Sequence, residues 1–335
     1  MVSVPSPSTA AAGAKILAAT WNTDVRDAVQ YFLDNIGGYG DSRNVIVNPY
    51  GSIWQGPTSL AITSSATPQY HADQWCTRRS GTTGCTVSRQ TGPTGQPYSI
   101  RIQRDSGNSS TTAIETMQPL ETLASTPLAG LSCQLRLRMK SGGNFSASGS
   151  LVTVEVTYGT GTDQAPPASG WTGTGSALST TQALTTTMTD FTFNSIAIPS
   201  NASQVQVLVK YTPVGTASTN DWFEIAGCQL TSGQAPGWER RAHAQELIMC
   251  QRFYQVGQNY FGGYVVTGGG CGWRAPYPVA MRSTPIMAYT NVSNVGFGTT
   301  VESAALSASY HVVNRTGTST GMALYLETWT ANSRL

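Results

Sequence analysis

The sequence predicts a mainly β protein: an antiparallel jelly-roll β-sandwich, a smaller C-terminal β domain and a short N-terminal helix. The first observation behind this prediction is that apolar and polar residues alternate in several segments, which is the period of a half-buried strand. The second is composition, because charged residues make up only 11% of the chain and strong helix formers are scarce. With 335 residues, the chain is long enough for two modest domains.

Residues 1–43 are the first predicted unit, an N-terminal attachment arm followed by a helix. Residues 1–20 are rich in Ser, Pro and Ala, which favours an extended arm. Asn22 suits a helix N-cap, and Gly37 ends the predicted helix. Its apolar positions form a narrow seam: Val25, Val29, Phe32 and Ile36. An isolated helix of this length is marginal in water, so we predict a homotrimer held by the seam or docking of the helix on a partner protein; a helix packed on its own domain is the alternative.

Residues 44–237 are predicted to form the sandwich. The clearest strand is 133–140, where Cys133, Leu135, Leu137 and Met139 alternate with Gln134, Arg136, Arg138 and Lys140, giving one apolar and one basic face. Residues 152–158 and 205–211 show the same period, and 222–230 is apolar on both faces, which predicts a central strand. The residues expected in the core are Trp54, Trp75, Leu137, Val154, Val207, Trp222 and Ile225.

Residues 238–254 are predicted to be a helical connector, and 255–335 a small terminal β domain punctuated by glycines. Several segments of the chain resemble recurring segments of tail-fibre and other virion structural proteins of tailed bacteriophages. These segments are 48–59 (NPYGSIWQGPTS), 70–75 (YHADQW), 158–163 (YGTGTD), 211–216 (YTPVGT), 220–227 (NDWFEIAG), 239–254 (ERRAHAQELIMCQRFY) and 281–285 (MRSTP). In the connector, Phe253 stands where the family pattern has Tyr. The resemblance covers about two thirds of the chain.

The resemblance implies a sandwich similar to that of carbohydrate-binding modules and a non-enzymatic virion structural protein. The function expected from it is a trimeric tail fibre, mounted through its N-terminal segment on other virion proteins, whose distal domain recognises the host surface. A capsid decoration or head-fibre protein is one alternative, and a tail-associated glycan depolymerase is another. The protein would then be assembled in the host bacterial cytoplasm and reside in the virion.

Charge and hydropathy restrict the expected partners. The net charge is +2, and the Lys and Arg residues are scattered along the sequence, so we expect no nucleic-acid partner. No apolar run reaches transmembrane length, so no membrane insertion is expected. The first residues also lack the charged start and apolar core of a signal peptide, which indicates folding in a cytosol.

The six cysteines contain no CxxC motif and no His at metal-ligand spacing, so we expect buried free thiols. A disulfide between Cys76 and Cys85 across a hairpin stays open as an alternative. No cofactor is expected. Loop carboxylates such as Asp163 or Asp221 are the minor candidates for a structural Ca²⁺ site.

Catalytic chemistry has little support in the sequence. The three His residues lie far apart, and there is neither a Gly-x-Ser-x-Gly elbow nor a phosphate-binding loop. Asp221 and Glu224 are the only pair that suggests a glycosidase, but residues three apart on a strand point to opposite faces, which favours a structural role. Trp171, Trp273 and Tyr277 lie in loop-like contexts and are the predicted exposed stacking platforms for a host glycan.

Overall fold

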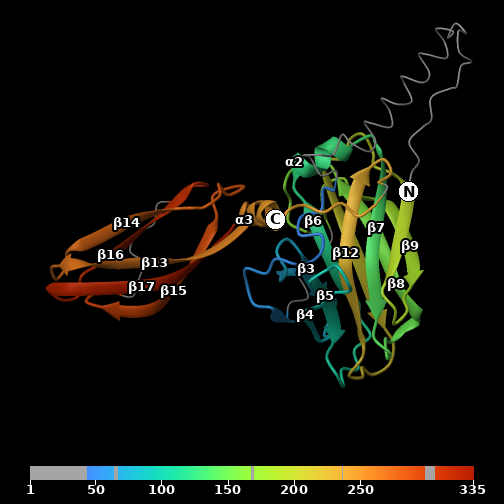
Figure 1. Cartoon of the computed structure of the whole chain (residues 1–335), viewed down its shortest axis with the longest axis horizontal. Coiled ribbons are helices and arrows are strands. Elements are labelled where there is room, and N and C mark those ends of the chain that lie inside the picture. Colours follow the sequence, from blue (N-terminus) through green and yellow to red (C-terminus); the bar gives the residue numbers. More distant parts are fainter. Residues whose placement is uncertain (1–43, 64–66, 167–169, 236, 299–305) are drawn as a thin grey trace, which may run out of the picture.

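The computed structural model contains a β-sandwich and a smaller β domain that projects from it, joined by a short helix (Figure 1). The structure describes residues 44–63, 67–166, 170–235, 237–298 and 306–335. The predicted N-terminal helix and its seam, Val25, Val29, Phe32 and Ile36, lie outside the described residues. Within them, no helix is long and apolar enough to cross a membrane.

Two antiparallel sheets form the sandwich, which confirms the predicted fold class. Sheet A runs in the order β1 (Ser59–Ile62), β4 (Cys85–Thr91), β5 (Tyr98–Arg104), β12 (Trp222–Ser232), β7 (Ser132–Ser141) and β10 (Thr189–Ala197). Sheet B runs in the order β2 (Gln69–Tyr70), β3 (Cys76–Arg79), β6 (Ile114–Leu120), β11 (Gln204–Pro213), β8 (Ala147–Gly159) and β9 (Gly175–Ala183). Strand β12 lies between β5 and β7, so its predicted central position is confirmed. After β6 the chain makes a short turn of helix, α2 (Thr122–Ser125), and a 3-10 turn, η1 (Thr126–Leu128).

The core lies between sheets A and B. Leu135, Leu137 and Met139 of β7 are fully buried, whereas Arg138 and its basic neighbours point outward, as the alternation predicted. Of the residues expected in the core, most are buried: Trp75, Leu137, Val154, Val207 and Ile225. Trp54 is partly buried against this core. The expectation for Trp222 was wrong, because its register places it on the outer face of sheet A, opposite Gln103.

The cysteines are all free thiols, so a Cys76–Cys85 disulfide is not formed. The two residues begin strands of different sheets, β3 and β4. Their proximity in sequence therefore does not make a hairpin. Burial raises the pKa of the Cys85 thiol to about 12, so this thiol stays protonated and unreactive at neutral pH.

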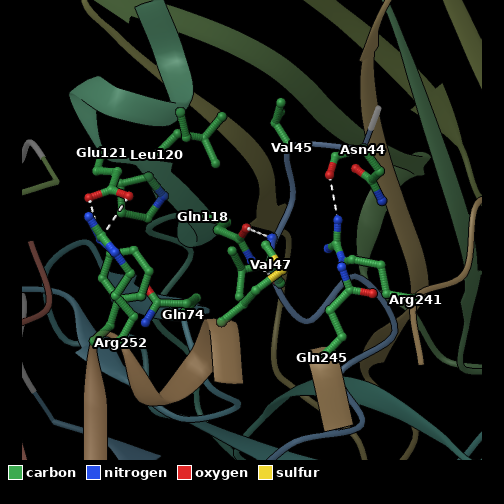
Figure 2. A pocket seen from close by; sticks show the side chains of 14 residues that line it. Asn44, Val45, Val47, Gln74, Gln118, Leu120, Glu121, Arg241, Gln245 and Arg252 are labelled. Carbon is green, nitrogen blue, oxygen red and sulfur yellow. Dashed lines mark hydrogen bonds and ion pairs between the residues drawn. The ribbon is translucent and has the colours of Figure 1, made fainter. Parts of the chain in front are cut away.

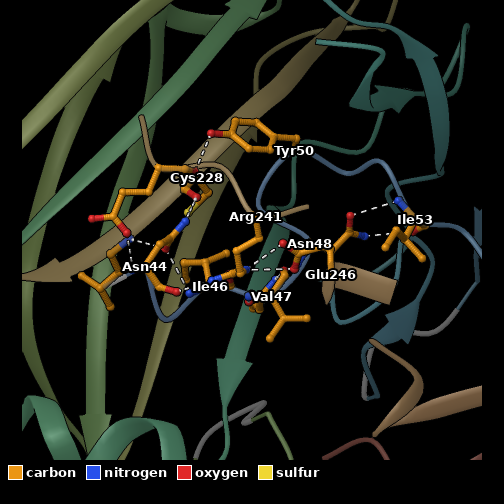
Figure 3. Close-up of polar contacts among 12 residues, drawn as sticks. Asn44, Ile46, Val47, Asn48, Tyr50, Ile53, Cys228, Arg241 and Glu246 are labelled. Carbon is orange, nitrogen blue, oxygen red and sulfur yellow. Dashed lines mark hydrogen bonds and ion pairs between the residues drawn. The ribbon is translucent and has the colours of Figure 1, made fainter. Parts of the chain in front are cut away.

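Helix α3 (His243–Gln251) connects the two domains and is tied to the first described residues of the sandwich (Figure 3). Glu246, in its first turn, accepts a hydrogen bond from the backbone N of Asn48 at 2.5 Å and pairs with Arg241 at 2.8 Å. The Arg241 guanidinium also donates to the backbone carbonyls of Asn44, at 2.6 Å, and Ile46. These contacts fix the start of the helix on the segment that precedes β1.

The C-terminal domain consists of two small antiparallel sheets. Sheet C runs in the order β13 (Tyr254–Val265), β17 (Gly321–Asn332) and β15 (Ile286–Val295), and sheet D pairs β14 (Gly270–Pro276) with β16 (Tyr310–Thr316). The sheets face each other through aromatic side chains: Trp273 of sheet D stacks on Phe261 of sheet C at 5.6 Å between ring centroids. An ion pair between Arg315 and Glu327 is buried in the same layer, with 2.5 Å between Nη2 and Oε2.

The end of the chain returns to the sandwich and holds the two domains together. The Tyr70 hydroxyl donates to the backbone O of Leu335 at 2.8 Å, and the Arg334 guanidinium lies over the ring of Tyr70 at 4.4 Å. Arg282 bridges the domains by pairing with Asp163 at 2.7 Å. The junction is therefore built from specific polar contacts in addition to the connecting helix.

Candidate functional site

The outer face of sheet A gathers cations from several strands and is the candidate functional site. Three of them follow one another along β7. Strand β5, on the other side of β12, adds Arg101, which lies beside Glu224 of β12. The segment after β12 passes over this face and adds Trp238 and Arg240. We call this surface the basic face and define it by Tyr50, Arg101, Arg136, Arg138, Lys140, Asp190, Trp222, Glu224, Trp238 and Arg240.

Aromatic rings support the cations of the basic face. The guanidinium of Arg101 lies 4.0 Å from the ring centroid of Trp222, and those of Arg136 and Arg138 each lie 5.2 Å from that of Trp238. Trp238 packs on a bulge of β12 at Gly227, where a Cβ would come within 3.0 Å of the indole. The absence of a side chain at Gly227 thus lets Trp238 lie against the sheet. Cation–π contact holds these guanidinium groups in place over the sheet.

Carboxylates on the basic face are fewer than cations. Glu224, only 1% exposed, accepts from Arg101 at 2.6 Å and pairs with Lys140 at 3.3 Å. Asp190 accepts from Arg138 at 2.5 Å, and this hydrogen bond holds the pKa of Asp190 below its usual value.

Within the described residues, the basic face therefore carries five cations against two carboxylates. Arg136 has no ion-pair partner there, and its Nε is buried without a hydrogen-bond partner in the same part of the chain. The excess positive charge of this face suits an anionic ligand.

A pocket of about 260 Å³ lies between α3 and the sandwich (Figure 2). Its apolar lining comes mainly from Val45, Leu120, Met249 and Phe253. Several polar groups around it are engaged within the chain: the Gln118 amide bonds the backbone N and O of Val47 at 2.8 and 2.7 Å, and Arg252 pairs with Glu121 at 3.0 Å. The Nε2 of Gln74 is buried without a hydrogen-bond partner among the described residues. The volume is also below the range of about 300–1,000 Å³ that is typical of ligand pockets. We therefore assign it to packing at the junction.

The predicted stacking platforms do not form an exposed aromatic surface. Trp171 is 3% exposed, and its Nε1 donates to the backbone O of Ala165 at 2.9 Å. Tyr277 is 7% exposed and packs against Trp329, and Trp273 lies half-buried between the sheets of the C-terminal domain. The expected exposure of Trp171 and Tyr277 was wrong, because the Trp171 ring packs against the backbone at Gly159 and Tyr277 belongs to the core of the C-terminal domain.

The carboxylates that suggested catalysis or metal binding are engaged in ion pairs. Asp221 is fully buried and pairs with Arg104 at 3.2 Å, while Glu224 lies on the opposite, outer side of sheet A. The structural role predicted for Asp221 is confirmed, because its carboxylate pairs with a buried Arg. Asp163 pairs with Arg282. Among the residues that the structure describes, no group of three or more His, Cys, Asp or Glu side chains could hold a metal ion.

Sequence reasoning found the basic side of β7 but did not identify it as a site. The alternation of Arg136, Arg138 and Lys140 was visible, whereas the positions of Trp238 and Arg101 over the same sheet were not. The residues of the basic face come from several separate segments of the sequence, so the charges appeared scattered.

No protein-family model matches the chain, and no curated protein matches it. Among solved structures, it is similar to TmCBM61 in complex with beta-1,4-galactotriose (TM-score 0.33, 11% identity, 57% of this chain and 99% of that chain). It is also similar to a family 11 carbohydrate-binding module from Clostridium thermocellum in complex with a beta-1,3-1,4-mixed-linked tetrasaccharide (TM-score 0.32, 9% identity, 52% and 99%). A third similar structure is the arabinose-bound α-L-arabinofuranosidase MgGH51 (TM-score 0.30, 14% identity, 62% and 32%). Likeness at these scores supports no inference about ligand or activity.

Proposed function

We propose that this protein is a non-enzymatic structural component of a bacteriophage virion, a trimeric tail fibre that binds an acidic glycan of the host surface through the basic face. The virion part of the proposal is supported by the resemblance of segments such as 220–227 and 239–254 to tail-fibre proteins. The binding part is carried by one observation, the excess of ring-supported cations on the outer face of sheet A.

The chemistry of the basic face favours a polyanion with spaced carboxylate or phosphate groups. Successive outward residues on one side of a strand lie about 7 Å apart, so Arg136, Arg138 and Lys140 form a row of charges along β7. A guanidinium donates two parallel hydrogen bonds to a carboxylate or phosphate, which gives orientation as well as affinity. Arg136 is the strongest candidate for ligand contact, because the carboxylates nearby already pair with Arg101, Arg138 and Lys140.

Binding can be tested with the full-length protein and a uronic-acid polymer, polygalacturonate, with dextran as the neutral control. We expect binding to polygalacturonate that weakens with added salt, and no binding to dextran. Arg136→Gln should weaken binding about tenfold, because a charge-assisted hydrogen bond contributes about 1.5–3 kcal/mol. Lys210→Gln removes the same charge from the outer side of sheet B and should leave binding unchanged. Equal effects of the two variants would contradict the assignment of the basic face.

The virion part requires a different measurement. Locating the protein by antibody labelling in images of the intact particle should place it on the tail. Labelling on the head would favour a capsid decoration or head-fibre protein instead. Release of reducing ends from the bound glycan would favour a depolymerase.

A further inference from the structure

A carboxylate of the sandwich is buried at the domain junction. Asp73 is 1% exposed, and within the described residues it forms no ion pair. In the same part of the chain, both hydrogen bonds to its carboxylate come from Gln55: the backbone N donates to Oδ1 at 3.3 Å, and Nε2 donates to Oδ2 at 2.6 Å. A buried carboxylate that is held by neutral donors is costly in its charged form.

A tight turn fixes Asp73 in this position. The backbone N of Trp75 donates to the carbonyl of Ala72 at 2.8 Å, which closes a four-residue turn around Asp73 and Gln74. Gln74, the third residue of the turn, has a φ of 70°, the left-handed value that a type II turn requires there. The backbone N of Asp73 also donates to the carbonyl of Ile53 at 3.0 Å. Because the backbone is held in this way, the carboxylate gains water mainly when the groups that cover it move away.

Gln55 links this carboxylate to the C-terminal domain. Its Nε2 donates to Asp73 and also to the backbone O of Tyr254, the first residue of β13, at 2.6 Å. The Arg334 guanidinium closes the same junction, because it lies 4.1 Å from the ring centroid of Tyr254 and 4.4 Å from that of Tyr70. Separation of β13 and the end of the chain from the sandwich would free the Gln55 side chain and let water reach Asp73.

We propose that the junction between the sandwich and the C-terminal domain is a proton-controlled hinge, which is held closed when Asp73 is protonated and opens more readily when Asp73 is ionised. The hinge does not depend on ligand binding by the basic face. A neutral carboxyl group loses little by burial, whereas a carboxylate gains hydration when the junction opens. Burial raises the pKa of Asp73 to about 6, against the lowering effect of the Gln55 hydrogen bonds and of the Arg334 charge.

His71, two residues before Asp73, stays neutral while the junction opens and closes. Its Nδ1 accepts a hydrogen bond from the backbone N of Ala72 at 2.8 Å, and its Nε2 bonds the Thr77 hydroxyl at 2.9 Å; both partners belong to the sandwich. Its ring also lies 5.8 Å from that of Trp54. Burial lowers the pKa of His71 to about 3. His71 therefore contributes to the pH dependence of global unfolding, whereas Asp73 governs that of the hinge.

The groups that face Asp73 from other elements also keep one charge state near neutral pH. Helix α3 contributes Cys250, and burial raises the pKa of this thiol well above its usual value. Glu246, on the same helix, is already in an ion pair. Burial likewise raises the pKa of Tyr70, on β2, so its hydroxyl stays protonated. Arg334 is the nearby cation, and a guanidinium remains charged throughout this range.

The sign of the effect follows from linkage. The closed junction binds the Asp73 proton more tightly than the open one, so acid favours the closed state and opening becomes easier as pH rises through 6. With a pKa of about 6 in the closed junction and about 3.9 once Asp73 is hydrated, the equilibrium constant for opening should be about tenfold larger at pH 7.5 than at pH 5.

Hydrogen exchange of the full-length protein tests the hinge, with rates expressed as protection factors so that the pH dependence of intrinsic exchange cancels. Between pH 5 and pH 7.5, we expect protection at residue 55, at 252–254 and at 333 to fall about tenfold. Asp73→Asn keeps the size of the side chain and does not titrate, so its protection at these residues should lack this fall. Amides of β7 should respond to pH equally in the two proteins. Equal pH dependence at the junction of both proteins, or tighter closure of the wild type at pH 7.5, would overturn the proposal.

A second measurement uses the wild type alone and holds even if Asp73→Asn does not fold. The Asp73 carboxyl carbon, followed by NMR of the labelled protein, should titrate near pH 6. Titration near the ordinary Asp value of about 3.9 would show that the closed junction does not retain the proton, and the hinge would be ruled out.

Discussion

Substituting Asn for Asp221 should strongly destabilise the sandwich. Asp221 accepts hydrogen bonds from Arg104, at 3.2 Å, and from the backbone N and the hydroxyl of Ser146, at 2.9 and 2.8 Å. The Tyr211 hydroxyl donates to the same carboxylate. Both partners of the ion pair are completely buried. The substitution keeps the size of the side chain but leaves the Arg104 charge in the interior without an opposite charge.

The expected cost follows from that burial. Removing one partner of a buried ion pair typically costs about 3–5 kcal/mol, which is a large part of the 5–15 kcal/mol that stabilises a typical domain. Asp190→Asn is the matched control, because Asp190 pairs with Arg138 on the surface, with side chains 34% and 22% exposed. An exposed pair contributes about 0–1 kcal/mol. The two identical chemical changes should therefore differ by at least about 2 kcal/mol.

Urea unfolding at pH 7, followed by far-UV circular dichroism, measures both costs. Hydrogen exchange would locate the loss, which we expect in β5, which carries Arg104, and in β12, which begins directly after Asp221. If Asp221→Asn cost no more than Asp190→Asn, the buried pair would contribute nothing and the reasoning from burial would be refuted.

Three further predictions concern the core, acid stability and the domain junction. Leu137→Asp should abolish folding of the sandwich, because a carboxylate would enter a fully buried site, whereas Arg136→Ala should fold normally by circular dichroism. Burial lowers the pKa of His71 from 6.5 to about 3, so the unfolded chain binds a proton at this site below pH 6.5 that the folded protein does not bind. The free energy of unfolding of the wild type, relative to that of His71→Gln, should therefore fall by up to about 1.4 kcal/mol per pH unit as pH drops from 6.5 towards 3; a pH-independent difference between the two proteins would contradict this. Arg282→Ala removes the 2.7 Å ion pair with Asp163 and should accelerate hydrogen exchange at residues 252–254 and 333, while β7 stays protected. Unchanged exchange at residues 252–254 and 333 would show that this ion pair does not secure the junction.

The sequence by itself determined the features that depend on local periodicity. The two-residue period of β7 separated Leu137 from Arg136 without knowledge of any partner strand, because successive side chains of a strand point to opposite faces. The same geometry placed Asp221 and Glu224 on different sides of sheet A, and apolar residues on both faces of β12 indicated its central position. The fold class followed from these patterns and from the scarcity of helix formers.

Only the tertiary structure decided which distant segments meet. Trp238 lies over Arg136 and Arg138 because the chain after β12 crosses back over sheet A, and no local pattern encodes that path. Cys76 and Cys85 are close in sequence but begin strands of opposite sheets, so their thiols stay free. The residues around Trp171 have the composition of an exposed loop, yet the Trp171 side chain is buried. Strand pairing and loop direction depend on contacts between residues far apart in sequence, and so the basic face emerges only when the sheets are assembled.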